Sequence, residues 1–264
     1  MLYSTIIKVI TLYQYTAFQV FFLLPLVFQE KTMTTVKSTL LLFTLLSTVA
    51  GNAALADNSD GAAFTTWPDT GLTTCYDSAG NILDPCPTKD EPFYGQDAQN
   101  QGPSRSYTVL GGGIMVRDNI TGLIWERKQN KDDTKDYTNP HDTDNTYTWC
   151  NTNSNTNGGS QGSCGTNDTE DFINALNNAS FGGYSDWRLP TLKELATLTD
   201  YTRYAPAINT TVFPATASYN WSYWTATTNA ANAGGAWYIN TYYGYDYISG
   251  KGGLYHVRAV RGGQ

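Results

Sequence analysis

The sequence predicts an α+β domain built from short antiparallel strands, two short helices and long polar loops. Three observations support this prediction. In several segments, apolar residues alternate with polar ones between Gly, Asn and Asp residues, which is typical of strands joined by turns. Two later segments carry helix-capping residues followed by an apolar stripe at helical spacing. The C-terminal part returns to strand-like alternation with many tyrosines and tryptophans.

The first 56 residues hold most of the continuous apolar sequence. Residues 33–56 combine a short positive region, an apolar core and small residues that end at Ala56, which is the pattern of a signal peptide cleaved after that residue. No cysteine directly follows the apolar core, so we do not expect a lipoprotein. We interpret residues 1–32 as an extension from an upstream start codon, with a genuine membrane anchor as the alternative.

Residues 57–112 are rich in Gly, Pro, Asp and Thr and show no sustained helical or alternating period. We therefore expect an extended, disulfide-bearing arm laid on the domain of residues 113–264. Trp67 and Tyr76, together with a disulfide, are the residues that we expect to hold the arm in place.

Four cysteines lie after the predicted cleavage site, where export to an oxidising compartment favours disulfides. The simplest of the three connectivities pairs sequence neighbours, and each bond would close a short loop. A zinc site with His141 is the weaker alternative, since the sequence has no Cys-x-x-Cys spacing. The predicted pairs are Cys75 with Cys86 and Cys150 with Cys164.

Residues 113–118 and 122–127 predict a β-hairpin with one apolar face. Residues 128–167 are polar, so we expect a long loop with one short strand at residues 147–149. Carboxylates at residues 132–144 of this loop are the kind of ligand that Ca²⁺ prefers. Their spacing matches no known loop motif, so we expect a solvated acidic loop and leave calcium binding as the alternative.

Two short amphipathic helices are predicted between residues 168 and 198. Asp168 or Thr169 caps the first, and Thr191 and Glu194 form a capping box at the start of the second. Helices this short are marginal in isolation, so both are expected to pack against a sheet. Their apolar stripes consist of Phe172, Ile173 and Leu176 in the first helix and Leu192, Leu195 and Leu198 in the second.

After residue 209 the sequence becomes rich in aromatic residues, with Gly and Asn between them. Strands are predicted at residues 223–227, 236–242 and 255–260. Trp is usually mostly buried, so we expect the tryptophans of this region and Trp187 to be core or near-core residues. The tryptophans of this region are Trp221, Trp224 and Trp237.

The composition excludes two classes of protein. An intrinsically disordered chain has low hydrophobicity and high charge, whereas this one is 41% hydrophobic and 15% charged. A nucleic-acid-binding protein needs a basic face, whereas this chain has 16 Lys and Arg against 23 Asp and Glu. We therefore expect no nucleic-acid partner.

Three runs of the sequence resemble the Lcl C-terminal domain family: DNITGLIW at residues 118–125, GGYSDWRLPTLKEL at 182–195 and VRAVRG at 257–262. The resemblance implies a C-type-lectin-like domain in which two helices flank a twisted antiparallel sheet. Some relatives are surface adhesins that bind sulfated glycans, and others are variable proteins of diversity-generating retroelements. The resemblance therefore implies an exported ligand-binding protein or adhesin, whose C-terminal segment resembles the diversified segment of the retroelement proteins.

The composition of residues 228–235 and 242–256 supports a recognition surface. Tyrosines give large and fairly rigid contact areas, while Gly, Ser and Asn give adaptable hydrogen bonding, as in antibody loops. An extended chain would display Tyr243, Tyr245 and Tyr247 on one side. The alternative is that these rings only cover a face of the sheet and bind no ligand. The predicted ligand-binding residues are Asn229, Asn232, Tyr242, Tyr243, Tyr245, Asp246, Tyr247, Ser249, Lys251, Tyr255 and His256.

Three arginines of the resembling runs are expected to be structural. Arg188, Arg258 and Arg261 can each form forked hydrogen bonds to carbonyls or carboxylates. Glu194 and Asp186 are the acidic residues that we consider as partners. The alternative is a clamp for a polyanion made by Arg258 and Arg261.

No enzymatic activity is predicted. After residue 56 the histidines are His141, for which we expect a solvated imidazole, and His256, and neither lies in a catalytic or metal motif. The reactive cysteines of the related formylglycine-generating enzymes have no counterpart after Cys164. A structural cell-envelope protein with a self-associating tail is the main alternative, and an enzyme of the formylglycine-generating type is a weaker one.

The expected location is the periplasm, the cell surface or the extracellular space. We expect a cell-surface or extracellular glycan or protein as the ligand, and neither a cofactor nor a metal. Membrane association is expected only if residues 1–32 are a genuine anchor. The sequence leaves the oligomeric state open.

Overall fold

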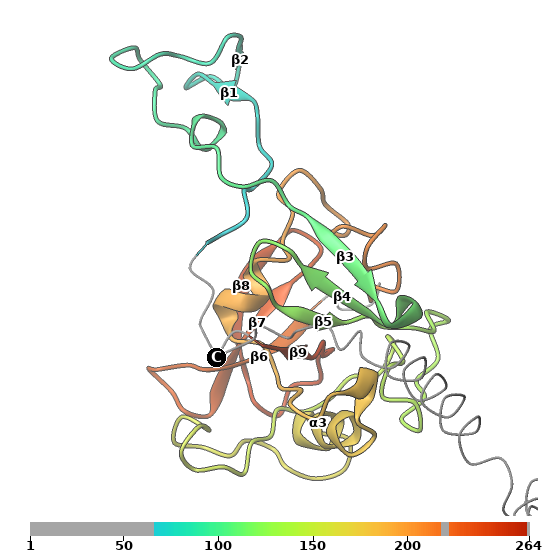
Figure 1. Cartoon of the computed structure of the whole chain (residues 1–264). Helices are drawn as coiled ribbons and strands as arrows, with labels where there is room; N and C mark the ends of the chain where they lie inside the picture. Colours follow the sequence, from blue (N-terminus) through green and yellow to red (C-terminus); the bar gives the residue numbers. More distant parts are fainter. Residues whose placement is uncertain (1–65, 218–221, 263–264) are drawn as a thin grey trace, which may run out of the picture. The chain divides into compact units, whose positions relative to one another are not determined.

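The computed structural model describes residues 66–217 and 222–262. Within these residues the fold is α+β, with antiparallel sheets and two short α-helices, as predicted (Figure 1). The predicted signal peptide, the N-terminal extension and Trp221 lie outside the described residues. In the described part, no helix is long and apolar enough to cross a membrane.

A four-stranded sheet joins the predicted hairpin to the C-terminal end of the chain, in the order β3-β4-β5-β9. Both hairpin strands are present, which confirms the prediction. Strand β3 lies in the segment that we predicted as an arm without regular structure, so that segment contributes a strand to the sheet. The strands are β3 (Tyr107–Leu110), β4 (Met115–Asp118), β5 (Ile124–Glu126) and β9 (Val260–Arg261).

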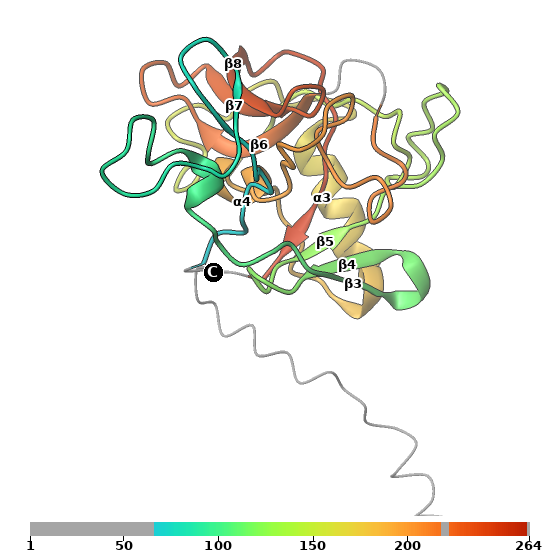
Figure 2. The ribbon, with the colours of Figure 1, turned by 90° about the horizontal axis from the view of Figure 1, so that it is seen from above.

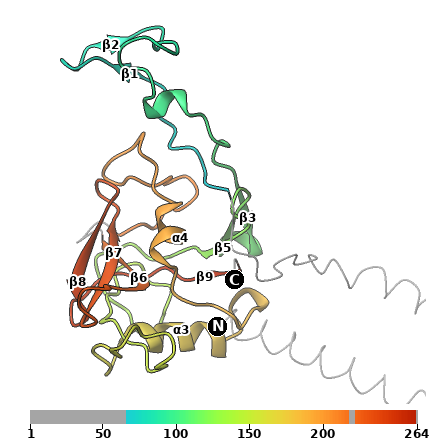
Figure 3. The ribbon, with the colours of Figure 1, turned by 90° about the vertical axis from the view of Figure 1, so that its left-hand side faces the viewer.

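A three-stranded sheet contains the aromatic strands, in the order β6-β7-β8. Strands β6 (Ser222–Thr228) and β7 (Gly235–Asn240) agree closely with two of the predicted strands. The third prediction, a strand over residues 255–260, is wrong in its extent, because only its end forms β9 while Tyr255 and His256 make isolated bridges. Strand β8 (Tyr245–Gly250) forms the outer edge of the sheet (Figure 3).

The two α-helices begin at the predicted caps. Helix α3 (Thr169–Asn178) is capped by the Asp168 carboxylate, which accepts hydrogen bonds from the amides of Glu170 and Asp171. Helix α4 (Leu192–Ala196) has the predicted capping box of Thr191 and Glu194. Helix α4 packs against β6 and β7 (Figure 2), while short 3-10 helices occur at Asp97–Gln99, Gly111–Gly113 and Phe181–Gly183.

Two apolar clusters form the core, one containing Trp224 and the other containing Tyr223 and Ile239. Trp224 donates its ring N–H to the Tyr147 carbonyl, so its polar atom is satisfied although the side chain is fully buried. Trp187 is likewise buried, as predicted, whereas Trp237 is half-buried.

The segment before β3 contains the two-stranded pair β1 (Cys75–Tyr76) and β2 (Ile82–Leu83). Trp67 and Tyr76 are about half exposed, and the disulfide that was predicted to help hold this segment is present. Its anchors are polar: the Arg105 guanidinium donates to the carbonyls of Thr197 and Thr199.

Both predicted disulfides are present, one between Cys75 and Cys86 and the other between Cys150 and Cys164. They are compatible with an extracellular or periplasmic protein. The sulfurs of Cys150 and Cys164 lie close to the Asp168 carboxylate, but they are joined to each other. They therefore supply no thiolate for the zinc site that we considered.

Candidate recognition surface

The turn between β7 and β8 is pressed closely against a neighbouring loop. Gly244 has a φ of 83°, which an L side chain rarely adopts, and its N–H donates to the Asn240 carbonyl. A Cβ at this position would lie 2.5 Å from Cγ2 of Thr199. Any other residue here would strain the turn that carries the neighbouring tyrosines.

Three tyrosines of the turn and of β8 point outward, as the sequence predicts for a chain that displays them. The exposed fractions are 64% for Tyr243, 47% for Tyr245 and 64% for Tyr247. The rings of Tyr243 and Tyr245 are nearly parallel, with centroids 6.4 Å apart. Tyr242 is half-buried and meets the Tyr243 ring edge-on, with centroids 4.5 Å apart. We call Tyr242, Tyr243, Tyr245 and Tyr247 the tyrosine surface.

A second layer of rings supports the tyrosine surface from the core. Tyr238 lies opposite Tyr247 and stacks on Tyr255, with centroids 4.7 Å apart. Tyr255 in turn meets the buried Trp224 edge-on, and its hydroxyl donates to Oγ of Ser249. Burial raises the pKa of Tyr238, and the neighbouring tyrosines Tyr255, Tyr245 and Tyr247 raise it further. The predicted site residues Tyr255 and Ser249 are thus both partly buried and hydrogen-bonded to each other.

The loop after α4 extends this surface with two tyrosines that the sequence analysis missed. Tyr201 is 49% exposed and Tyr204 is 76% exposed. The loop is joined to the β7–β8 turn by hydrogen bonds from the Ala205 amide to the Tyr242 carbonyl and from the Ala207 amide to the Thr241 carbonyl. Two tyrosines three residues apart were visible in the sequence, but no local pattern placed their loop beside the turn.

Two predicted ligand-binding residues are buried, which corrects the prediction. Lys251 is 2% exposed, and its Nζ donates to the carbonyls of Asn157 and Ser160 and lies 3.7 Å from the centroid of a Trp149 ring. His256 is also 2% exposed, and its Nδ1 lies 3.0 Å from the Asn145 carbonyl oxygen. Residues 145–160 fold over both side chains, so both belong to the framework.

The predicted asparagines lie at the other end of β7. The Asn229 and Asn232 side-chain oxygens accept hydrogen bonds from the amides of Ala231 and Gly234, so they shape the β6–β7 turn. A six-residue strand spans roughly 20 Å. The structure therefore does not bring these asparagines together with the tyrosine surface. Asp246, in contrast, is exposed on β8 between Tyr245 and Tyr247.

The arginines of the family-like runs are structural, as predicted. The Arg188 guanidinium donates to both carboxylate oxygens of Glu194, at 2.8 and 2.6 Å. Arg261 makes a similar fork to Asp186. Arg258 is 2% exposed, and its guanidinium lies near the rings of Phe213 and Tyr223 and donates to the Glu126 carbonyl. Burial of Arg258 and Arg261 contradicts the alternative of a polyanion clamp.

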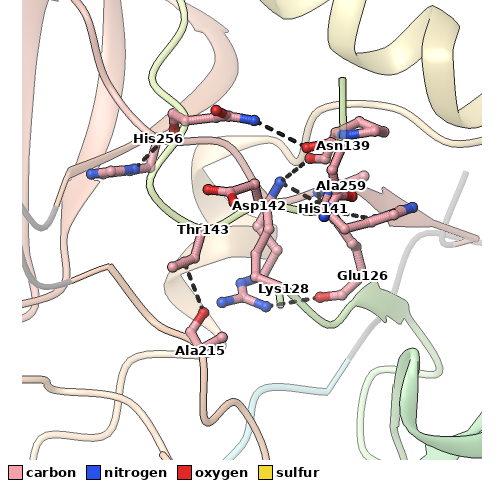
Figure 4. A network of polar contacts seen from close by, with 12 residues as sticks. Glu126, Lys128, Asn139, His141, Asp142, Thr143, Ala215, His256 and Ala259 are labelled. Atoms are coloured by element: carbon pink, nitrogen blue, oxygen red, sulfur yellow. Dashed lines mark hydrogen bonds and ion pairs between the residues drawn. The ribbon is translucent and has the colours of Figure 1, made fainter. Parts of the chain in front are cut away.

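A buried polar network beside β5 was also missed (Figure 4). Oε1 of Glu126 lies 3.1 Å from Nζ of Lys128 and 2.9 Å from Nδ1 of His141, while Oε2 accepts a hydrogen bond from the Ala259 amide. Burial alone would raise the pKa of Glu126, but Lys128, His141 and the amide outweigh it and lower that pKa. Burial lowers the pKa of Lys128. His141 is therefore a network member, and the prediction of a solvated imidazole is wrong.

The acidic loop is more ordered than predicted. Asp142 is 2% exposed, which contradicts a fully solvated loop, and burial raises its pKa. The carboxylates of Asp132, Asp136, Asp142 and Asp144 accept hydrogen bonds from backbone amides of the same loop. These carboxylates stabilise turns.

A cavity of about 360 Å³ lies between α3, the Cys150–Cys164 loop and residues 188–191. This volume is in the range of small-molecule sites. Glu170 is the one carboxylate among its lining residues, and its oxygens accept hydrogen bonds from the amide and hydroxyl of Thr152. The cavity therefore lacks the pair of facing carboxylates that a glycosidase uses.

The sequence matches a known family. The model of the Lcl C-terminal domain matches residues 114–261, which is more than half of the chain. The chain belongs to the Lcl C-terminal domain family. The matched residues include β4 to β9, both α-helices and the whole tyrosine surface. Comparisons with curated proteins and with solved structures give no match.

Proposed function

We propose that this member of the Lcl C-terminal domain family is an exported binding protein with a C-type-lectin-like domain, and that the tyrosine surface contacts its ligand. The family suggests a lectin-like or binding domain. The proposed ligand is a glycan or a protein of the cell surface or extracellular space.

One observation carries the proposal: Tyr243, Tyr245 and Tyr247 are exposed side by side on a rigid support. Neighbouring exposed aromatic rings on a soluble domain often mark an interaction site. Tyrosine also loses little conformational entropy on binding, because its ring rotates about only two bonds. The second layer of rings and the close contact at Gly244 hold this surface in place before any ligand arrives.

The described histidines favour binding over catalysis. His141 is bonded to Glu126, and His256 is buried beneath the Asn145 carbonyl. Within the described residues the four cysteines form two disulfides, so neither histidine has a free thiol to activate as a nucleophile. We therefore propose a non-enzymatic role.

The experiment replaces Tyr243, Tyr245 and Tyr247 together by Ala in the full chain. We expect binding to an array of glycans and extracellular-matrix proteins to fall at least tenfold, because the contact area is lost. The thermal unfolding midpoint should change little, since substitutions at exposed positions usually alter stability by about 0.5 kcal/mol or less.

The matched control replaces three aromatic residues of similar exposure elsewhere, Tyr76, Phe93 and Tyr94. It should retain binding. Loss of binding in the control alone, or unfolding of the tyrosine variant, would contradict the proposal. A structural envelope protein would instead show self-association that depends on the tyrosine surface, with no ligand on the array.

Diversification of the tail is a further part of the proposal, made from the resemblance to retroelement variable proteins. It is tested by sequencing the last fifty codons in sibling isolates. Substitutions confined to codons derived from AAY, next to a reverse transcriptase gene with an adenine-rich template, would support it. Silent changes spread evenly along the segment would contradict diversification.

A further inference from the structure

The outer side of β8 is a free sheet edge within the described residues. Its inner side pairs with β7 in an unbroken antiparallel register from Tyr245 to Gly250. The opposite edge of the sheet is covered, because β6 exchanges backbone hydrogen bonds with His256. No described segment covers the outer side of β8 in this way, and Figure 3 shows it at the margin of the sheet.

The hydrogen-bond pattern between β7 and β8 identifies which backbone N–H and C=O groups of β8 point away from the sheet. The Lys251 amide donates to the Gly234 carbonyl, and hydrogen-bonded pairs alternate with non-bonded pairs along an antiparallel ladder. Tyr245, Tyr247 and Ser249 therefore direct their backbone groups toward β7. Asp246 and Ile248 direct their N–H and C=O groups away from the sheet.

This edge lacks the usual protection. Natural proteins block free edges with lysines, prolines, bulges or very short strands. Strand β8 has six residues, YDYISG, with an unbroken register and neither lysine nor proline. Its one charged residue, Asp246, is an acid. An unprotected sheet edge is what strand-addition domains use to bind extended peptides, and here three exposed tyrosines lie beside it.

The charges around the edge favour a basic peptide. Asp246 is the exposed charge on β8, Lys251 is buried, and Arg203 in the adjacent loop is already paired with Asp200 at 2.9 Å. An added strand would alternate its side chains between the two faces of the sheet. Basic side chains on one face would lie over the tyrosine rings, and those on the other would meet Asp246.

We infer that β8 binds an extended basic peptide segment by strand addition, with the tyrosine surface contacting alternate side chains. This inference rests on the proposed function and narrows the ligand to a polypeptide. In this proposal the backbone groups of Asp246 and Ile248 provide the affinity for the peptide, and the tyrosines select among its side chains.

The probe is the eight-residue peptide Lys-Lys-Thr-Thr-Lys-Lys-Thr-Thr with blocked ends, which places lysines on both faces of an added strand and is tested on the full chain. The matched control is the same peptide with its internal amides N-methylated, which keeps side chains and charge but removes the donors that a strand needs. We expect the N-methylated peptide to bind at least tenfold more weakly by fluorescence anisotropy. We also expect the unmethylated peptide to slow hydrogen exchange at the amides of Asp246 and Ile248 at least tenfold.

On the protein side, Ile248→Pro removes an outward N–H without removing a β7–β8 hydrogen bond, and Ile248→Val is its matched control. The proline variant should bind the two peptides with similar affinity, whereas the valine variant should still bind the unmethylated peptide more tightly. Because the peptide comparison uses the unaltered protein, it decides the question even if Ile248→Pro does not fold.

Equal affinity for the two peptides, no measurable binding of the unmethylated peptide, or unchanged exchange at Asp246 and Ile248 would overturn the inference. The triple tyrosine variant separates this failure from failure of the proposed function. If that variant loses a glycan or protein ligand of the array while the peptides bind alike or not at all, the tyrosine surface remains the site and only strand addition is excluded.

Discussion

Strands β6 and β8 belong to one sheet, yet their aromatic side chains have opposite environments. Trp224, Tyr238 and Tyr247 lie opposite one another on three successive strands. Trp224 is fully buried, Tyr238 is half-buried and Tyr247 is 64% exposed. Exposure is therefore set by the position of the strand in the sheet, because the cover of core residues ends before β8. Aromatic content alone does not separate framework from recognition surface.

The largest expected effect on stability comes from removing the Trp224 side chain. The matched comparison removes Tyr247, the exposed member of the same set of opposed side chains. Trp224→Ala should lower the free energy of unfolding by roughly 3–5 kcal/mol, because it opens a cavity and removes one of the two hydrogen bonds that the Tyr147 carbonyl accepts. Tyr247→Ala should change it by about 0.5 kcal/mol or less. Urea unfolding followed by tryptophan fluorescence or circular dichroism measures both. Similar losses in the two variants would show that β8 is part of the core.

A second contrast concerns carboxylates. Glu126 is fully buried between Lys128 and His141, whereas Asp246 is exposed on β8. Glu126→Gln leaves the Lys128 ammonium buried without its counter-charge, which should cost roughly 3 kcal/mol at neutral pH. Asp246→Asn is the matched control and should be nearly neutral in urea unfolding.

The pH dependence sharpens this second contrast. The folded state holds the pKa of Glu126 below its ordinary value of 4.5, so the carboxylate contributes stability above pH 4.5. That contribution is lost as the pH falls below 4.5 and through the folded pKa. The difference in unfolding free energy between the native chain and Glu126→Gln should therefore shrink on acidification. A difference that stays constant down to acid unfolding would contradict a charged Glu126.

The sequence predicted the features that depend on residues close to each other in the chain. The cap at Asp168, the capping box of Thr191 and Glu194 and both disulfides join neighbours, and their side-chain chemistry leaves few alternatives. The pairing of Arg188 with Glu194 spans six residues and was also anticipated.

The features that the sequence did not reveal depend on distant segments. Lys251 and His256 have charged or polar side chains, which predict exposure. Residues 145–160 nevertheless cover both side chains and supply the backbone carbonyls that contact their nitrogen atoms. Tyr201 reaches the recognition surface only because its loop packs against Gly244. Tertiary contacts of this kind leave no local pattern of spacing.

A third and more modest loss of stability should come from Gly244, where the turn between β7 and β8 contacts Thr199. Gly244→Ala places a Cβ 2.5 Å from Cγ2 of Thr199 in a backbone conformation that disfavours alanine, so we expect a loss of about 1–2 kcal/mol in unfolding free energy. Gly250→Ala is the matched control, because a Cβ there meets nothing within 4 Å and its φ is not positive.

The two glycine variants also test whether the tyrosine surface depends on that contact. Relief of the clash must move the turn away from Thr199 and carry Tyr243 with it, so Gly244→Ala should weaken ligand binding more than its modest effect on stability accounts for. Gly250→Ala should leave binding unchanged. Native-like affinity in Gly244→Ala would show that the tyrosines adapt to their ligand and are not held in place beforehand by the framework.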